Sequence, residues 1–332
     1  MKGRLFVSFA ALALAATPAR AQIDTQRCPA TTNAQRISQD ACQKAIDLFA
    51  YLAPQLATTV AGGNATLGMA GSLGGLGHFS AGLRVNALQG SLPQFQDITV
   101  STSGAQNNPP IDTKTQLFPM PTAELAIGIF KGLPLAITNV GGVDLLVSAA
   151  YLPEFNSSGV SVKVPNGSLK LGYGARVGIL QESLLVPGVS VSYVRRDLPT
   201  VNIAASSGSD SLYVNNFALK TTAWRVVASK GLLLFGFAAG IGQDKYESST
   251  DVSAHVAARA LTPAANAGPI SLAQNITRTN VFADLSMNLL LFKLTGEIGQ
   301  VSGGTINTYN TFSGKQAADS RVYGSVGARF GF

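Results

Sequence analysis

Apolar and polar side chains alternate along most of this chain. In residues 167–180 the odd positions hold Leu169, Leu171, Tyr173, Ala175, Val177 and Ile179, and the even positions hold Ser168, Lys170, Gly172, Gly174, Arg176 and Gly178. The pattern recurs at 78–87, 122–129, 143–151, 233–242 and 277–291. A period of two predicts β-strands with one apolar face. A soluble sandwich alternates in this way too, so alternation alone does not say whether the apolar face meets lipid.

The lengths of the segments favour a membrane barrel. The strands expected here commonly reach ten residues, whereas globular strands average about five to six and a tilted membrane-spanning strand needs roughly 9–11. Long polar connections at 104–120, 153–166, 204–212, 248–275 and 302–319 alternate with short ones near 90–94, 182–187, 230–231 and 292–293. Bacterial outer-membrane barrels have short periplasmic turns and longer outer loops.

We therefore predict an all-β fold, an antiparallel transmembrane β-barrel of about 12 strands within a range of about 10–14. Eleven strands are expected at 78–90, 94–103, 121–131, 141–152, 167–181, 187–203, 213–229, 231–247, 276–291, 292–301 and 319–332. The glycine-rich residues 65–77 supply a weaker twelfth. In such a barrel the apolar row of 167–180 faces lipid and its polar row faces the lumen.

Composition changes the picture in two ways. Charged residues make up only 12% and mean hydropathy is positive, yet the interior of the chain has no long uncharged apolar run, which argues against a helical membrane protein. The formal net charge of +7 is spread along the chain without basic clusters. Binding of nucleic acid is therefore not expected.

The first residues have the pattern of an export signal. Lys2 and Arg4 precede a short apolar stretch, and Ala19 and Ala21 are placed as small residues at a cleavage site. The stretch is too short for a membrane anchor. We expect a signal peptide at 1–21, an N-terminal helical segment at 22–60 and an outer-membrane barrel at 61–332.

The helical segment is clearest at 33–53. Ala41, Ala45, Leu48 and Leu52 follow a helical period, Ser38 can cap the start, and Pro54 is expected to end the helix. It could pack on the periplasmic side or act as a plug inside the barrel. Cys28 and Cys42 predict a disulfide in an exported protein, with two free thiols as the alternative.

The last strand carries a class resemblance. The chain ends RVYGSVGARFGF, with Val326, Ala328, Phe330 and Phe332 on one face, although Gly324 interrupts the row. This resembles the closing strand of bacterial outer-membrane β-barrel proteins, which implies a location in the Gram-negative outer membrane. The resemblance also implies two partners, outer-membrane lipids and the barrel assembly machinery, with Phe330 and Phe332 as the assembly signal. A helical segment before a wide barrel is also weakly similar to the long-chain fatty-acid transporters, without a matching motif.

Because alternate residues of a strand face opposite sides of the sheet, the positions opposite the apolar rows predict the charged lining of the lumen. The candidates are Arg84, Glu124, Asp144, Lys170, Arg176, Arg278, Asp284, Lys293, Glu297 and Arg329. This mixed lining predicts a porin-like passage for small polar or amphipathic solutes. The alternative is a structural or surface-binding barrel with a closed interior, whose function lies in the outer loops, especially 248–275.

Catalytic and cofactor chemistry is not indicated. His78 and Ser80 share a strand face and resemble the base and nucleophile of outer-membrane phospholipases, but Ala81 replaces the asparagine of that pattern and the pair faces away from the apolar row. Residues 172–178 lack the third glycine of a phosphate loop. Two cysteines without a nearby histidine make a metal site improbable. We expect no enzyme activity, no metal and no cofactor.

Overall fold

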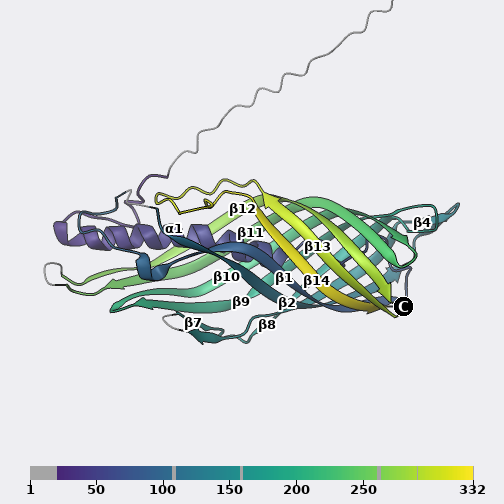
Figure 1. The fold of residues 1–332 in the computed structure, drawn as a ribbon, viewed down its shortest axis with the longest axis horizontal. Coiled ribbons are helices and arrows are strands. Elements are labelled where there is room, and N and C mark those ends of the chain that lie inside the picture. Colours follow the sequence, from purple (N-terminus) through teal and green to yellow (C-terminus); the bar gives the residue numbers. More distant parts are fainter. Residues whose placement is uncertain (1–20, 107–109, 158–159, 260–262, 290, 332) are drawn as a thin grey trace, which may run out of the picture.

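The computed structural model describes residues 21–106, 110–157, 160–259, 263–289 and 291–331. The expected signal peptide lies almost wholly outside this range. One α-helix, α1 (Asn33–Ala61), precedes a series of antiparallel strands (Figure 1). No helix in the described residues is long and apolar enough to cross a membrane.

Ten strands close into a ring. They are β1 (Phe79–Pro93), β2 (Thr113–Phe130), β5 (Gly142–Tyr151), β8 (Leu169–Leu180), β9 (Gly188–Ser207), β10 (Asp210–Leu232), β11 (Phe235–Val256), β12 (Ala265–Leu289), β13 (Phe292–Ser302) and β14 (Arg321–Gly331). Each pairs with the next in this order, and β14 pairs back to β1, with Ser80 opposite Gly331. Closure leaves no sheet edge in the ring, so the backbone groups that face lipid are paired.

The predicted all-β transmembrane barrel is confirmed, and its strand number lies at the lower end of the expected range. Two expected strands are not strands. Residues 94–103 contain the short 3-10 helix η1 (Phe95–Asp97), and residues 65–77 run through the interior of the ring. Shorter hairpins complete the sheet structure: β3 (Leu133–Leu135) with β4 (Thr138–Val140), and β6 (Phe155–Ser157) with β7 (Val160–Lys163). Strand β7 also pairs with the outer part of β9.

The outer face of the ring is apolar. Leu171, Tyr173 and Val177 on β8 are exposed by 64%, 61% and 45%, whereas Arg176 on the other face of the strand is buried. The odd row of 167–180 therefore faces outward, where a bilayer covers it. The aromatic side chains of Trp224 on β10, and of Tyr151 and Phe292 at strand ends, also point outward.

The strands at one end extend beyond the apolar belt. On β10, Asn216, Lys220 and Thr222 face outward, and the large outward apolar residues of the belt begin at Trp224. The expected long loop at 248–275 is mostly strand, because β11 continues to Val256 and β12 starts at Ala265. Residues 204–212 likewise form the ends of β9 and β10. On these extensions polar residues face outward and apolar residues such as Phe217, Leu219 and Val252 face inward, which reverses the alternation of the spanning strands.

Helix α1 lies inside the ring at this extended end (Figure 1). It contacts β1, β2, β9, β10, β11, β12 and β14, which surround it. Thr32 and Gln35 form a capping box at its start, not Ser38, and Gly62 ends it. Pro54 does not end the helix as expected. Burial of Ala53, Ala57 and Val60 within the ring offsets the roughly 3 kcal/mol cost of an internal proline.

The chain crosses the ring from the long-loop end to the short-turn end. Near its start, α1 contacts the β1–β2 loop, where Lys44 donates a hydrogen bond to the carbonyl oxygen of Thr99 at 2.7 Å. Farther along, Ser72 donates a hydrogen bond to Gln181, beside the β8–β9 turn, at 2.6 Å. In an outer-membrane barrel the short-turn end is periplasmic. We therefore call the long-loop end the outer end.

Candidate functional site

The interior of the ring holds a glycine-rich segment, residues 62–78, which we call the strap. Its first carbonyl oxygens, with that of Ala61, accept hydrogen bonds from arginines on three strands. Arg196 donates to Ala61 at 2.6 Å, Arg225 to Gly62 and Gly63 at 3.0 and 3.2 Å, and Arg84 to Asn64 at 2.8 Å. The last carbonyls of a helix carry partial negative charge, so arginines stabilise this end of α1.

Carboxylates of the ring bind the strap through its N–H groups. The backbone nitrogen of Asn64 donates to Glu297 at 2.6 Å, that of Gly68 to Asp284 at 2.9 Å, and that of Leu73 to Asp144 at 3.0 Å. Hydrogen bonds to charged groups are stronger than neutral ones. The lumen therefore holds both the donors and the acceptors of the strap backbone.

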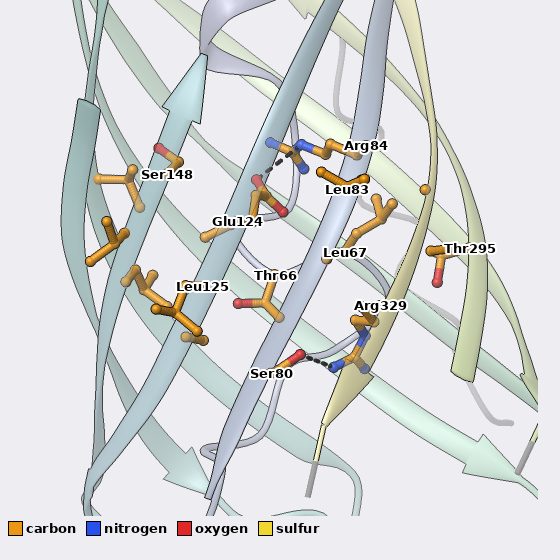
Figure 2. Close-up of a pocket in the computed structure, with 18 of the residues that line it drawn as sticks. Thr66, Leu67, Ser80, Leu83, Arg84, Glu124, Leu125, Ser148, Thr295 and Arg329 are labelled. Carbon is orange, nitrogen blue, oxygen red and sulfur yellow. Dashed lines mark hydrogen bonds and ion pairs between the residues drawn. The ribbon is translucent and has the colours of Figure 1, made fainter. Parts of the chain in front are cut away.

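Ion pairs link charged residues on different strands of the ring, both neighbouring and more distant. Glu124 pairs with Arg84 at 3.0 Å and with Arg196 at 2.9 Å, and Arg176 pairs with Asp144 at 2.8 Å. The first of these pairs is drawn in Figure 2, together with the hydrogen bond from Arg329 to Ser80. These groups lie away from water, and a buried charge is tolerated only when it is paired and hydrogen-bonded.

Little free space remains around residues 65–67 of the strap, whereas a wider recess of about 330 Å³ lies beside Met69 and Leu73 at the short-turn end. The cavity in Figure 2 lies between the strap and strands β1, β2, β5 and β14, and it has a volume of about 20 Å³. That is room for roughly one water molecule. Its lining includes Thr66, Leu67, Arg84, Glu124 and Arg329. In the described part of the chain, the lumen at this level is filled by side chains and by the strap.

The structure places the predicted lumen residues as follows. Six are buried inside the ring: Arg84, Asp144, Arg176, Arg278, Asp284 and Glu297. Glu124, Lys293 and Arg329 are partly buried on the same inner face, and Lys293 donates to the carbonyl oxygen of Gly68 at 3.1 Å. Lys170 is exposed near the start of β8. It lies beyond the buried part of the lumen, although its parity matches that of Arg176.

Several interior residues were not identified from the sequence. They are Arg196, Arg225, Asp244 and Arg321. Parity could have found Arg225, because it follows the outward-facing Trp224. Arg196 lies within the run Arg195–Asp197, where adjacent charges conceal which one points inward. Apart from His78 at its end, the strap carries no acidic or basic side chain, so charge patterning could not assign it to the lumen.

Two further predictions have a structural counterpart. The expected disulfide joins Cys28 and Cys42, next to the start of α1 at the outer end. Phe330 lies on the outward face of β14 and is 41% exposed, whereas Phe332 lies outside the described residues. Ser80 accepts a hydrogen bond from Arg329 at 3.1 Å. A guanidinium donor does not remove the proton of a serine hydroxyl, so this contact does not activate Ser80 as a nucleophile.

Asp47 connects α1 to the β13–β14 loop at the outer end. Its carboxylate accepts hydrogen bonds from the side chain of Asn310 at 2.7 Å and from the backbone nitrogens of Asn310 and Tyr309 at 2.8 and 3.1 Å. Burial raises the pKa of Asp47 above its ordinary value, although these hydrogen bonds act in the opposite direction.

Comparisons with known proteins give only distant likenesses. No protein-family model matches the chain, and no curated protein matches it. Among solved structures, Ail, the attachment invasion locus protein of Yersinia pestis, is 8% identical with a TM-score of 0.26, covering 77% of this chain and 99% of its own. OmpT, an outer membrane protein of Vibrio cholerae, is 9% identical with a TM-score of 0.21, covering 76% and 96%. An anion-selective porin from Comamonas acidovorans is 9% identical with a TM-score of 0.18, covering 77% and 98%.

The architecture of the chain itself assigns its class. A closed antiparallel ring, an outward apolar belt with aromatic residues and a polar interior together describe a bacterial outer-membrane β-barrel.

Proposed function

We propose that this protein is a plugged outer-membrane barrel whose function lies in binding at its outer end. The observation that supports this is the strap, whose backbone is bound from both sides by charged groups of the ring. Helix α1 occupies the ring above the strap, and the cavity beside residues 65–67 of the strap measures only about 20 Å³. The wider recess of about 330 Å³ beside Met69 and Leu73 lies below this level, at the short-turn end. A barrel closed in this way presents α1 and the long loops to the outside.

Passage of solutes, the function predicted from the charged lining, requires the strap to leave the ring. Its departure would leave Arg84, Arg196 and Arg225 without their carbonyl partners, and Asp144, Asp284 and Glu297 without their N–H partners. A buried polar group that loses its partner costs about 1–3 kcal/mol, and more when the group is charged. These contacts act together, so they favour the closed state.

The test is conductance in planar bilayers. The intact mature protein is expected to give no steady channel current. A variant that lacks residues 22–74 should form channels, because it keeps the ring from β1 onward and loses α1 and most of the strap. A variant that lacks only residues 22–26, which keeps the disulfide, is the control and should stay closed.

A folding check and one contrary outcome complete the test of the plugged barrel against an open channel. Folding of each variant is checked by the slower gel mobility that unfolding causes in barrels of this class. If the intact protein conducts as well as the variant without its plug, the lumen is open to solutes and the proposal of a plugged barrel is wrong.

A further inference from the structure

A groove lies between α1 and strands β9 and β10 at the outer end. It consists of two adjoining cavities, an inner one of about 70 Å³ and an outer one of about 80 Å³. Both are lined by Ala45, Leu48, Phe95, Ala205 and Leu212. We call the two together the outer groove. Native interiors are close-packed, so adjoining apolar cavities of this size call for an explanation.

The inner cavity is apolar on every side. Helix α1 contributes Ala45, Leu48, Phe49, Leu52, Ala53 and Leu56, η1 contributes Phe95, and the strands contribute Ile203, Ala205, Leu212, Val214 and Phe217. The helical apolar stripe noted in the sequence therefore lines a groove that it does not fill. Leu52, Ile203 and Leu212 keep part of their surface accessible, although apolar side chains gain most from full burial.

Lipid does not cover these side chains. Phe217 and Leu212 precede Trp224, the outward residue at the edge of the apolar belt, by seven and twelve positions on β10. At about 3.3 Å per residue, they lie roughly 23 Å or more along the strand beyond that edge. The groove therefore faces the interior of the extended outer end, away from the bilayer.

The outer cavity adds polar groups at one end. Lys44, Asp210 and His255 line it together with Ser206 and Ser211. The charged groups already have partners within the protein: Lys44 pairs with Asp40, and Asp210 pairs with Arg259 at 2.7 Å. This mouth offers hydrogen bonds without an unpaired charge. The polarity of the groove therefore changes along its length, from polar at the outer cavity to apolar at the inner one.

We propose that the outer groove binds one single-chain amphiphile, with its alkyl tail in the inner cavity and its polar head at the mouth. The change in polarity matches that of such a molecule. From Ala41 to Leu56 the groove follows α1 for about 22 Å at 1.5 Å per residue, which suits a long chain. The small cross-section suits an unbranched tail, and dry apolar cavities of comparable size take up apolar ligands.

This proposal rests on the proposed function, because it places the ligand at the outer end above a closed lumen. Free fatty acids and lysophospholipids share the alkyl tail and differ in the head. The groove as described recognises the tail, so the experiment uses both, together with a fatty alcohol.

The experiment measures binding of tritium-labelled palmitate to the full mature protein in nanodiscs, with empty nanodiscs as the background. Ala45→Leu and Ala205→Leu each fill the groove from an opposite wall. Each should weaken binding about tenfold, because the added methyl groups displace part of the buried tail. Ala50→Leu adds the same atoms to α1 away from the groove and is the matched control. Unlabelled lysophosphatidylethanolamine and hexadecanol are then used as competitors.

Competition by either molecule supports the proposal and identifies which head is tolerated. If palmitate binds the intact protein and both filling variants equally well, the proposal is wrong. It is also wrong if the intact protein binds no more palmitate than empty nanodiscs do. Leu48→Ala, which enlarges the groove, should retain binding, and its loss would also contradict the proposal. The filling variants should stay closed in planar bilayers, so failure of the amphiphile proposal is distinguishable from failure of the plugged-barrel proposal.

Discussion

Arg225 of β10 donates a hydrogen bond to the carbonyl oxygen of Gly62, at 3.0 Å, where α1 ends inside the ring. The same guanidinium pairs with Asp244 on the neighbouring strand β11 at 2.5 Å, and both side chains are almost fully buried. One side chain therefore stabilises the wall of the barrel and holds the plug against it.

Replacement of Arg225 by alanine should destabilise the whole barrel. The change leaves Asp244 as an unpaired buried charge, which typically costs about 3–5 kcal/mol. Urea unfolding in detergent micelles measures the loss. Lys220→Ala, at an exposed outward position of the same strand, is the control and should change the free energy of unfolding little. An Arg225→Ala protein as stable as that control would show that the pair is not part of the native interior.

A single added methyl group should disturb the strap at Gly63. A Cβ atom there would lie 2.5 Å from both the Glu297 carboxylate and the Tyr323 hydroxyl. Gly63→Ala should therefore cost about 1–3 kcal/mol through overpacking. Gly296 on the outward face of β13 has no described atom within 4 Å of such a Cβ, so Gly296→Ala is the matched control. Thermal unfolding compares the two variants, and equal midpoints would contradict the packing of the strap described above.

The barrel could be predicted from the sequence because lipid imposes a local pattern. Apolar residues recur at every second position of β8, at Leu171, Tyr173, Ala175 and Val177, because each outward position meets the same lipid. The lumen leaves no comparable pattern. Asn64 donates a hydrogen bond to Asp284 at 2.7 Å, and these residues are 220 positions apart. Contacts of this kind depend on closure of the ring, which no local window of sequence contains.

Tertiary burial also explains the two largest errors of the sequence interpretation. Pro54 marks a helix end in isolation, but the ring surrounds the next turn and stabilises it. The glycines of 65–77 suggested a strand, whereas several of them allow the strap to pass close to the ring. A Cβ at Gly68, for example, would lie 2.7 Å from the hydroxyl of Thr295, and its φ of 70° is in the left-handed region that favours glycine.

The mature N-terminus should be reachable from outside the cell. Helix α1 begins at the long-loop end, so an epitope inserted after Gln26 is expected to bind antibody on intact cells. An epitope in the β10–β11 turn, beside Leu233, should bind only after the outer membrane is permeabilised. If the first epitope also requires permeabilisation, α1 enters the barrel from the periplasm in cells, opposite to the direction described here.

The contact between α1 and the β13–β14 loop should depend on pH through Asp47. Burial raises the pKa of this carboxyl in the folded protein, so the folded state binds its proton more tightly than the unfolded chain does. The contribution of Asp47 to the free energy of unfolding should therefore fall as pH rises from about 3.9, the ordinary aspartate value, through the folded pKa. Asp47→Asn lacks this titration.

The measurement is urea unfolding of the intact protein and of Asp47→Asn across that pH range in the same micelles. The stability of the intact protein minus that of the variant should decrease as pH rises, whatever constant offset the asparagine introduces. A difference that increases with pH would show that the hydrogen bonds from Asn310 and Tyr309 outweigh burial and lower the pKa. A constant difference would mean that Asp47 titrates alike in the folded and unfolded chains.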